Sequence, residues 1–258
     1  MIDRKSEKER GARCVLACLG ALCLLVGCGR SETTPEADAI REIETALSLK
    51  ADAIREVETA LSLTPNTENG LRIYRICANC HQPEGWGLSD GSVPQLAGQH
   101  TKVIIKQLAD IRSGHRDDPK MFPFASESQI GAAQGIADVA GYIDTLEISV
   151  ATGRGKGDDL ERGKKIYAKN CVRCHGTEGQ GDNDSYIPRI QSQHYAYLVR
   201  QFEAIQHGMR GNADPDMVAQ TLDFTDRDIG AVLDYTSRLE PPEEFQAPPN
   251  WKNPDFMD

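Results

Sequence analysis

Apolar residues recur every three or four positions along most of this chain, which is the spacing of one face of an α-helix. The pattern is clearest over residues 37–63, at Ile40, Ile43, Leu47, Ile54, Val57 and Leu61. It predicts one helix of about 28 residues, roughly 40 Å long at 1.5 Å per residue, which Pro65 ends. Helix spacing returns at 135–146 and 228–239, and little of the sequence alternates as strands do. The expected fold class is all-α.

The long predicted helix is built from a duplication. Residues 37–49 (ADAIREIETALSL) recur as residues 51–63 with one change, Ile43 to Val57. The period is fourteen residues, or two heptads. We expect a spacer that lifts the rest of the chain away from its N-terminus. Pairing with another helix is the alternative, because two imperfect double heptads are too few to establish a coiled coil.

A longer repeat occupies most of the remaining chain. Residues 70–116 align with 164–210 at a constant offset of 94, and each copy follows the order short helix, loop, middle helix and C-terminal helix. The matched pairs include Pro94 with Pro188, Gln99-His100 with Gln193-His194, Gln107 with Gln201, and Arg116 with Arg210. Between the copies, residues 151–159 are glycine-rich and charged, as linkers are. We predict two similar domains at 65–150 and 151–240, followed by an extended proline-rich tail at 241–258.

The N-terminus has the pattern of an export signal. A segment with five basic residues precedes an apolar stretch from Cys14 to Gly27, which is too short to span a bilayer comfortably. The stretch ends in Leu25-Val26-Gly27-Cys28 and resembles a bacterial lipobox, in which the cysteine receives lipid and becomes the first residue. We expect a lipoprotein signal at 1–27 and a lipid-anchored spacer at 28–64, on the periplasmic side of a bacterial membrane. An ordinary signal peptide or an uncleaved anchor is the alternative.

Composition narrows the possible functions. The net charge is −10, so we do not expect the basic face that nucleic-acid binding requires. The acidic surface either is simply solvated or steers basic partner proteins toward this protein. Only 6% of the residues are aromatic, which is few for two apolar cores. A large apolar cofactor in each domain would supply the missing core.

The cysteines supply the chemistry. Of eight, four lie in or at the end of the N-terminal apolar run, and the others form Cys77-x-x-Cys80-His81 and Cys171-x-x-Cys174-His175. Two intervening residues place both thiols on one helical turn, where they can add across the two vinyl groups of a haem, and the adjacent histidine then faces the iron. A four-cysteine zinc site does not require a histidine after each pair, and a thioredoxin-like pair would need a strand–helix setting. We therefore predict two covalently bound haems.

With these motifs each half resembles a class I cytochrome c domain, and the tandem resembles the cytochrome c4 family. The resemblance covers about residues 66–240 and rests on GLRIYRICANCH…VPQLAGQH and GKKIYAKNCVRCH…IPRIQSQH. It implies domains wrapped around haem, one-electron transfer and iron held between histidine and methionine. It also implies that the carbonyls of Pro94 and Pro188 accept the Nδ1 protons of His81 and His175.

The methionine ligands are expected at Met121 and Met217, which align beside a matched proline. Met209 aligns with His115 instead, and Met257 lies in the tail. The loop around Met121 is shorter than its counterpart, so its conformation is expected to differ. Of the other histidines, His100 and His194 are expected at a helix start or near a haem propionate, and His115 and His207 have no matched histidine.

The expected function is a membrane-tethered electron carrier with two haems. The donor would be a quinol-oxidising complex or a periplasmic dehydrogenase, and the acceptor a terminal oxidase or reductase. The alternatives are a dihaem enzyme such as a peroxidase or a thiosulfate dehydrogenase, and a dedicated subunit of a larger oxidoreductase. A cysteine iron ligand is excluded, because the two haems use every cysteine beyond Cys28.

Overall fold

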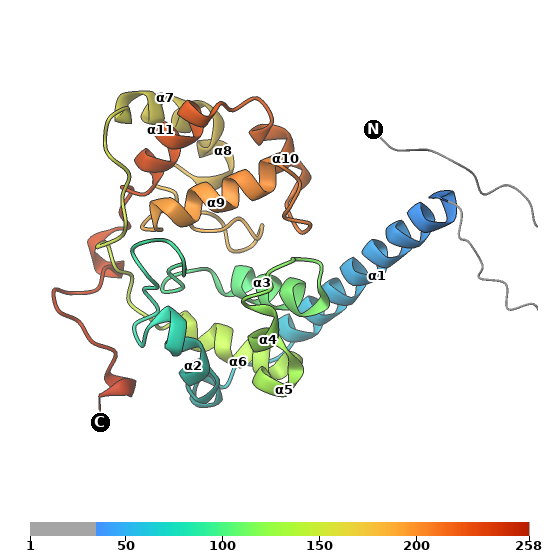
Figure 1. Ribbon diagram of the computed structural model, residues 1–258. Helices are drawn as coiled ribbons and strands as arrows, with labels where there is room; N and C mark the ends of the chain where they lie inside the picture. Colours follow the sequence, from blue (N-terminus) through green and yellow to red (C-terminus); the bar gives the residue numbers. More distant parts are fainter. Residues whose placement is uncertain (1–34, 258) are drawn as a thin grey trace, which may run out of the picture.

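A computed structural model describes residues 35–257; the predicted signal peptide and Cys28 lie outside them. Two helical bundles stack on one another and one long helix projects away (Figure 1). The helix is α1 (Pro35–Leu61). The first bundle holds α2 (Thr67–His81), α3 (Thr101–Ser113), α4 (Phe122–Ala125), α5 (Glu127–Ile130) and α6 (Ala133–Ile143). The second holds α7 (Leu160–Asn170), α8 (Val172–His175), α9 (Tyr195–Gln206), α10 (Pro215–Thr221) and α11 (Asp226–Thr236).

The predicted all-α class is confirmed. Within the described range only two isolated β-bridges occur, Ile148 with Gln246 and Asp182 with Ile187. The predicted helices before the cysteines, in the middle of each copy and at its end are all present. The short helices α4, α5 and α10, which surround the two methionines, were not predicted from the sequence. None of the described helices is both long enough and apolar enough to cross a bilayer.

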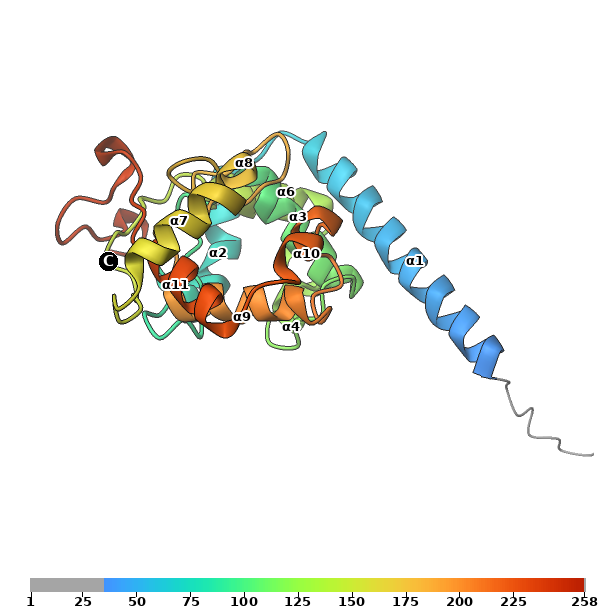
Figure 2. The ribbon, with the colours of Figure 1, turned by 90° about the horizontal axis from the view of Figure 1, so that it is seen from above.

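Helix α1 behaves differently in its two halves. Figure 2 shows its N-terminal half reaching away from both bundles, and there Ile43 and Leu47 are 60% and 62% exposed. In the second copy Ala53, Val57 and Ala60 are buried, and the Glu56 carboxylate pairs with the Arg112 guanidinium of α3. The second copy therefore packs on the first bundle and is not a free spacer, whereas the described part of the first copy extends away from both bundles.

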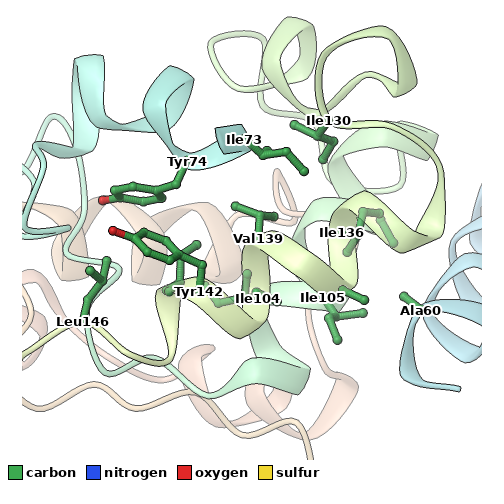
Figure 3. Packing of buried hydrophobic residues seen from close by; sticks show 14 of the residues in the cluster. Ala60, Ile73, Tyr74, Ile104, Ile105, Ile130, Ile136, Val139, Tyr142 and Leu146 are labelled. Carbon is green, nitrogen blue, oxygen red and sulfur yellow. The ribbon is translucent and has the colours of Figure 1, made fainter. Parts of the chain in front are cut away.

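The core of the first bundle forms where α2 crosses α6. Tyr74 and Tyr142 face one another with ring centroids 5.2 Å apart, surrounded by aliphatic side chains from α2, α3, α5 and α6 (Figure 3). Tyr167 and Tyr235 repeat the contact in the second bundle at 5.6 Å. Sixteen buried residues form the first core cluster but only six form the second. The second bundle thus has far less apolar core of its own.

The two copies differ before the first cysteine. Gly70 and Gly163 hold the same place, because a Cβ on either would strike a carbonyl oxygen of the facing helix, at 2.1 Å in both cases. Their offset is 93 rather than 94, so the gap-free alignment holds only from Cys77 onward. The extra residue lies between Tyr167 and Cys171. Consequently α2 runs unbroken to its histidine, whereas the second copy divides into α7 and α8.

The proline-rich tail lies along the first bundle. Trp251 packs on Trp86 with centroids 5.8 Å apart, and the Asn253 side-chain amide donates to the Pro83 carbonyl at 2.7 Å. The Tyr142 hydroxyl donates to the Asp255 carboxylate at 2.9 Å. The tail of the chain therefore covers the outside of the Tyr74–Tyr142 core.

Substitution of Gly163 tests the close approach of α7 to α11. Gly163→Ala places a methyl group 2.1 Å from the Ala231 carbonyl oxygen, and such overpacking costs about 1–3 kcal/mol. The matched control is Gly230→Ala on α11, where the nearest atom is the Tyr195 hydroxyl at 3.6 Å. That change should be neutral or stabilise by up to about 1 kcal/mol. Denaturant unfolding followed by circular dichroism measures both, and equal effects of the two variants would contradict the packing.

Candidate haem-attachment sites

The first candidate site occupies the last turn of α2. Cys77 is partly buried and Cys80 exposed, both as free thiols, while His81 is buried. In the second copy Cys171 precedes α8, and Cys174 and His175 lie within it. Each motif is therefore helical, with its two thiols and one imidazole on a single turn.

A proline carbonyl orients each histidine ring. His81 Nδ1 lies 3.0 Å from the Pro94 carbonyl oxygen and His175 Nδ1 lies 3.1 Å from that of Pro188. A carbonyl only accepts, so Nδ1 carries the proton and Nε2 keeps the lone pair that a metal needs. Burial lowers the pKa of both histidines, which favours the neutral ring required of a ligand.

Two glycines missed in the sequence analysis bring these carbonyls into place. The Gly87 N–H donates to the His81 carbonyl at 2.9 Å, and that of Gly181 donates to the His175 carbonyl at the same distance. Both have positive φ, at 70° and 67°. A Cβ on them would lie 2.5 and 2.6 Å from the proline carbonyl oxygens. The available signal was their spacing, since they share the offset of 94 with the cysteines.

A buried tyrosine closes each motif. The Tyr74 hydroxyl donates to the Gln82 carbonyl at 2.9 Å, and the Tyr167 hydroxyl donates to the Gly176 carbonyl at 2.8 Å. The accepting residue follows the histidine and has positive φ in both copies, 68° at Gln82 and 77° at Gly176. The chain therefore leaves each histidine by the same sharp turn, although only the second copy uses glycine there.

The four described methionines have different surroundings. Met217 lies in α10 and packs on the second core cluster, as Cys171 does. Met121 is partly buried and precedes α4, whereas Met209 and Met257 are each 64% exposed. The expected difference between the two segments is present: Met121 stands directly before the short helix α4, whereas Met217 lies in the first turn of α10.

One cysteine of each pair has a raised pKa. Burial is the main cause, and it raises the pKa of Cys77 to about 11 and that of Cys171 to about 12, which favours the protonated thiol at these two positions. Each pair also lies in its own bundle with its own histidine. The residues fit a haem held by two thioethers and one imidazole, and do not suit a shared four-cysteine metal centre.

Hydrogen bonds related by an approximate two-fold axis join the two bundles. The Gln99 side-chain oxygen accepts from the backbone N–H of Arg189 at 3.0 Å, and its amide nitrogen donates to the backbone carbonyl of Arg189 at 2.9 Å. The Gln193 side chain makes the same pair of bonds to Gln95, at the same two distances. Arg189 is the residue 94 positions after Gln95, so each domain contributes one glutamine and one backbone segment. We call this group the glutamine clamp.

The two matched histidines extend the symmetry. His100 and His194 stand directly before α3 and α9, so their expected place at a helix start is confirmed. His100 Nε2 lies 2.8 Å from the Gln180 carbonyl, and His194 Nε2 lies 2.8 Å from that of Trp86. Both contacts cross between domains. They give these histidines a structural role that the sequence analysis did not anticipate.

Comparison with known proteins agrees with this geometry. Residues 158–235 match the family model for the cbb3-type cytochrome c oxidase subunit III. Over 173 residues the chain is 31% identical to cytochrome c4 of Thiocapsa roseopersicina, covering 64% of this chain and 87% of that protein. The chain belongs to the cytochrome c4 family. It is a dihaem electron carrier of the class I cytochrome type.

One further relative and two solved structures are also similar to this chain. The thiosulfate dehydrogenase electron acceptor of Stutzerimonas stutzeri is 30% identical over 177 residues, covering 66% of this chain and 82% of that protein. The crystal structure of reduced cytochrome c4 from Pseudomonas stutzeri superposes with a TM-score of 0.60 at 23% identity, over 69% of this chain and 100% of that one. The cytochrome c4 structure from Acidithiobacillus ferrooxidans gives 0.55 at 27% identity, over 63% and 98%.

Replacing one pair of thiols tests the attachment sites. The pyridine haemochrome of the purified protein should give two haems per chain, and the haem stain should survive denaturing electrophoresis. Cys77→Ser with Cys80→Ser should halve the covalent haem, because no other described thiol lies at that site. Cys171→Ser with Cys174→Ser is the matched variant and should leave the other half. One haem per wild-type chain would refute two equivalent sites.

Proposed function

We propose that this cytochrome c4 relative is a periplasmic, membrane-tethered carrier that passes single electrons through two haems c, each closed by histidine and methionine. The observation that carries the proposal is the repetition of one complete arrangement. Each bundle combines Cys-x-x-Cys-His, a proline carbonyl on Nδ1 and a methionine downstream. The ligands would be His81 with Met121 and His175 with Met217, and Cys77, Cys80, Cys171 and Cys174 would hold the porphyrins.

In this role the haem supplies the redox couple and the chain sets its surroundings. The proline carbonyls fix the histidine tautomer and raise the basicity of Nε2. Met121 and Met217 would each supply a thioether as the second protein ligand of an iron, which would favour the ferrous state and raise the reduction potential. With both ligands supplied by the protein, peroxide or another small substrate would have no iron position to occupy. A carrier is therefore favoured over a dihaem peroxidase.

The partners are proposed as redox proteins. A quinol-oxidising complex or a dehydrogenase would donate electrons, and a terminal oxidase or reductase would accept them. The net charge of −10 would steer basic partner surfaces toward the protein. A dedicated role as the acceptor of one dehydrogenase is the second candidate, because a 30% identical relative is a thiosulfate dehydrogenase electron acceptor. Co-purification of an enzyme from solubilised membranes would favour this second role.

Removal of each methionine tests the closed iron sites. Met121→Ala and Met217→Ala should each remove one ligand from one iron. That iron should then bind carbon monoxide, and its reduction potential should fall. Met209→Ala is the matched control, because this side chain is 64% exposed and should affect neither iron. Native protein should be inert to carbon monoxide, with two low-spin haems. Rapid carbon monoxide binding by a native haem would favour the enzyme alternative.

Replacement of Cys28 tests the proposed anchor. Lipidated protein should partition into the detergent phase, and Cys28→Ser should enter the aqueous phase or accumulate with its signal uncleaved. Cys23→Ser, within the same apolar run, should leave partitioning unchanged. Mass spectrometry that finds an unmodified N-terminus elsewhere would contradict the anchor.

A further inference from the structure

The two copies of the duplicated motif in α1 have different surroundings although their sequences are nearly the same. Residues 51–63 pack on α3 and α6 of the first bundle, whereas most of residues 37–49 extend away from both bundles (Figure 2). Ala60 of the second copy is only 1% exposed, and Ile43 of the first copy is 60% exposed. One motif is therefore bound to a protein surface in one copy and open to solvent in the other.

The surface of α3 and α6 that residues 51–63 cover is here called the α1-binding surface. It buries Ala53, Val57 and Ala60, and the last two belong to the first core cluster. The Glu56 carboxylate adds an ion pair with the Arg112 guanidinium of α3. The contact thus combines one apolar face with one charge pair of fixed position.

Every α1 residue that makes this contact has a counterpart fourteen positions earlier. The small and charged residues are identical, and Ile43 differs from Val57 by one methylene group. The identical counterparts of Ala53, Glu56, Ala60, Leu61 and Leu63 are Ala39, Glu42, Ala46, Leu47 and Leu49. A shift of α1 along its own axis by fourteen residues would therefore bring the same side chains to the same places.

The shifted register needs a loop. Residues 51–64 would leave the surface and connect the bound first copy to Pro65, and the cost of closing such a loop grows only slowly with its length. In exchange the first copy would gain the packing that an exposed helix of this length lacks. The observed register needs no loop, so we expect it to be the main one.

We propose that the α1-binding surface accepts either copy of the motif, so that the chain can hold its haem domains at two distances from its N-terminus. The two registers differ by fourteen residues, which is about 21 Å of helix. The binding of either copy depends only on contacts of the described chain. Its consequence rests on the proposed anchor at Cys28, because a shorter projection of α1 would then bring the haem domains closer to the membrane and its redox partners.

The test measures the distance between two nitroxide labels by pulsed electron paramagnetic resonance on the full-length holoprotein in detergent. One label replaces Glu36 at the start of α1, and the other replaces Glu127, which is exposed at the start of α5. In the shifted register residue 36 takes the present place of Lys50, so the distance should shorten by up to about 21 Å. The wild-type sequence should give mainly the long distance.

Two matched substitutions select the register. Ala60→Glu places a carboxylate in the buried part of the contact, where it is costly, so the first copy should replace the second and give the short distance. Ala46→Glu makes the same change in the first copy, where residue 46 is exposed, and should leave only the long distance. Glutamate favours helix, so neither change should break α1. The double variant should lose both registers and give a broad distribution.

Failure of the anchor is distinguished by counting labels. Mass spectrometry should find two labels per chain, because lipid blocks Cys28. A third label would contradict the anchor and leave the α1-binding surface to be tested in the same variants with Cys28→Ser. Val57→Glu, with Ile43→Glu as its control, repeats the comparison if Ala60→Glu yields no holoprotein.

Three results would overturn the proposal. A broad distribution in Ala60→Glu, equal to that of the double variant, would show that the first copy does not replace the second. An unchanged long distance in both Ala60→Glu and Val57→Glu would show that the position of α1 does not depend on this face of the motif. A distance between molecules in protein labelled only at residue 36 would assign the exposed first copy to pairing between two chains.

Discussion

The glutamine clamp is the constraint on which the relation between the two haem sites depends. Gln99 and Gln193 each satisfy both backbone groups of a residue in the other domain. Those residues, Arg189 and Gln95, directly follow the prolines whose carbonyls orient the histidines. One short segment in each domain therefore holds the ligand ring on one side and the partner domain on the other. Because buried polar groups are costly to leave unpaired, this arrangement resists independent movement of the domains.

The low aromatic content is explained by the architecture. The second domain has a core cluster of only six buried residues, against sixteen in the first, and the first also gains the C-terminal half of α1 and the proline-rich tail. A covalently bound haem adds a large apolar body to each core. We therefore infer that the second domain depends more on its haem for stability. Its polar contacts with the first domain add to the support that its own apolar residues provide.

Much of this organisation followed from the sequence because it has short periods or fixed spacings. The helices follow from apolar periodicity, and the two sites from Cys-x-x-Cys-His and the offset of 94. The family resemblance implied that the carbonyls of Pro94 and Pro188 accept from the two histidines, and the structure contains both contacts.

Other features depend on contacts that no local pattern encodes. The packing of Ala53, Val57 and Ala60 on the first bundle was missed, because alanine adds little to an apolar stripe. Gly87 and Gly181 were missed because a glycine that is needed for close approach to a carbonyl looks like any other glycine in the sequence. The glutamine clamp was visible as matched residues, but its bonds cross between domains. Which residues pair with their own copy and which with the other is decided in three dimensions.

If the glutamine clamp joins the two haem sites into one relay, an electron added to one haem should pass to the other within the same molecule. Pulse radiolysis of the intact holoprotein can add one electron and follow how it equilibrates between the haems. We expect a first-order phase whose rate does not change with protein concentration. A rate proportional to protein concentration would mean that electrons pass between molecules and that the two sites act as separate carriers.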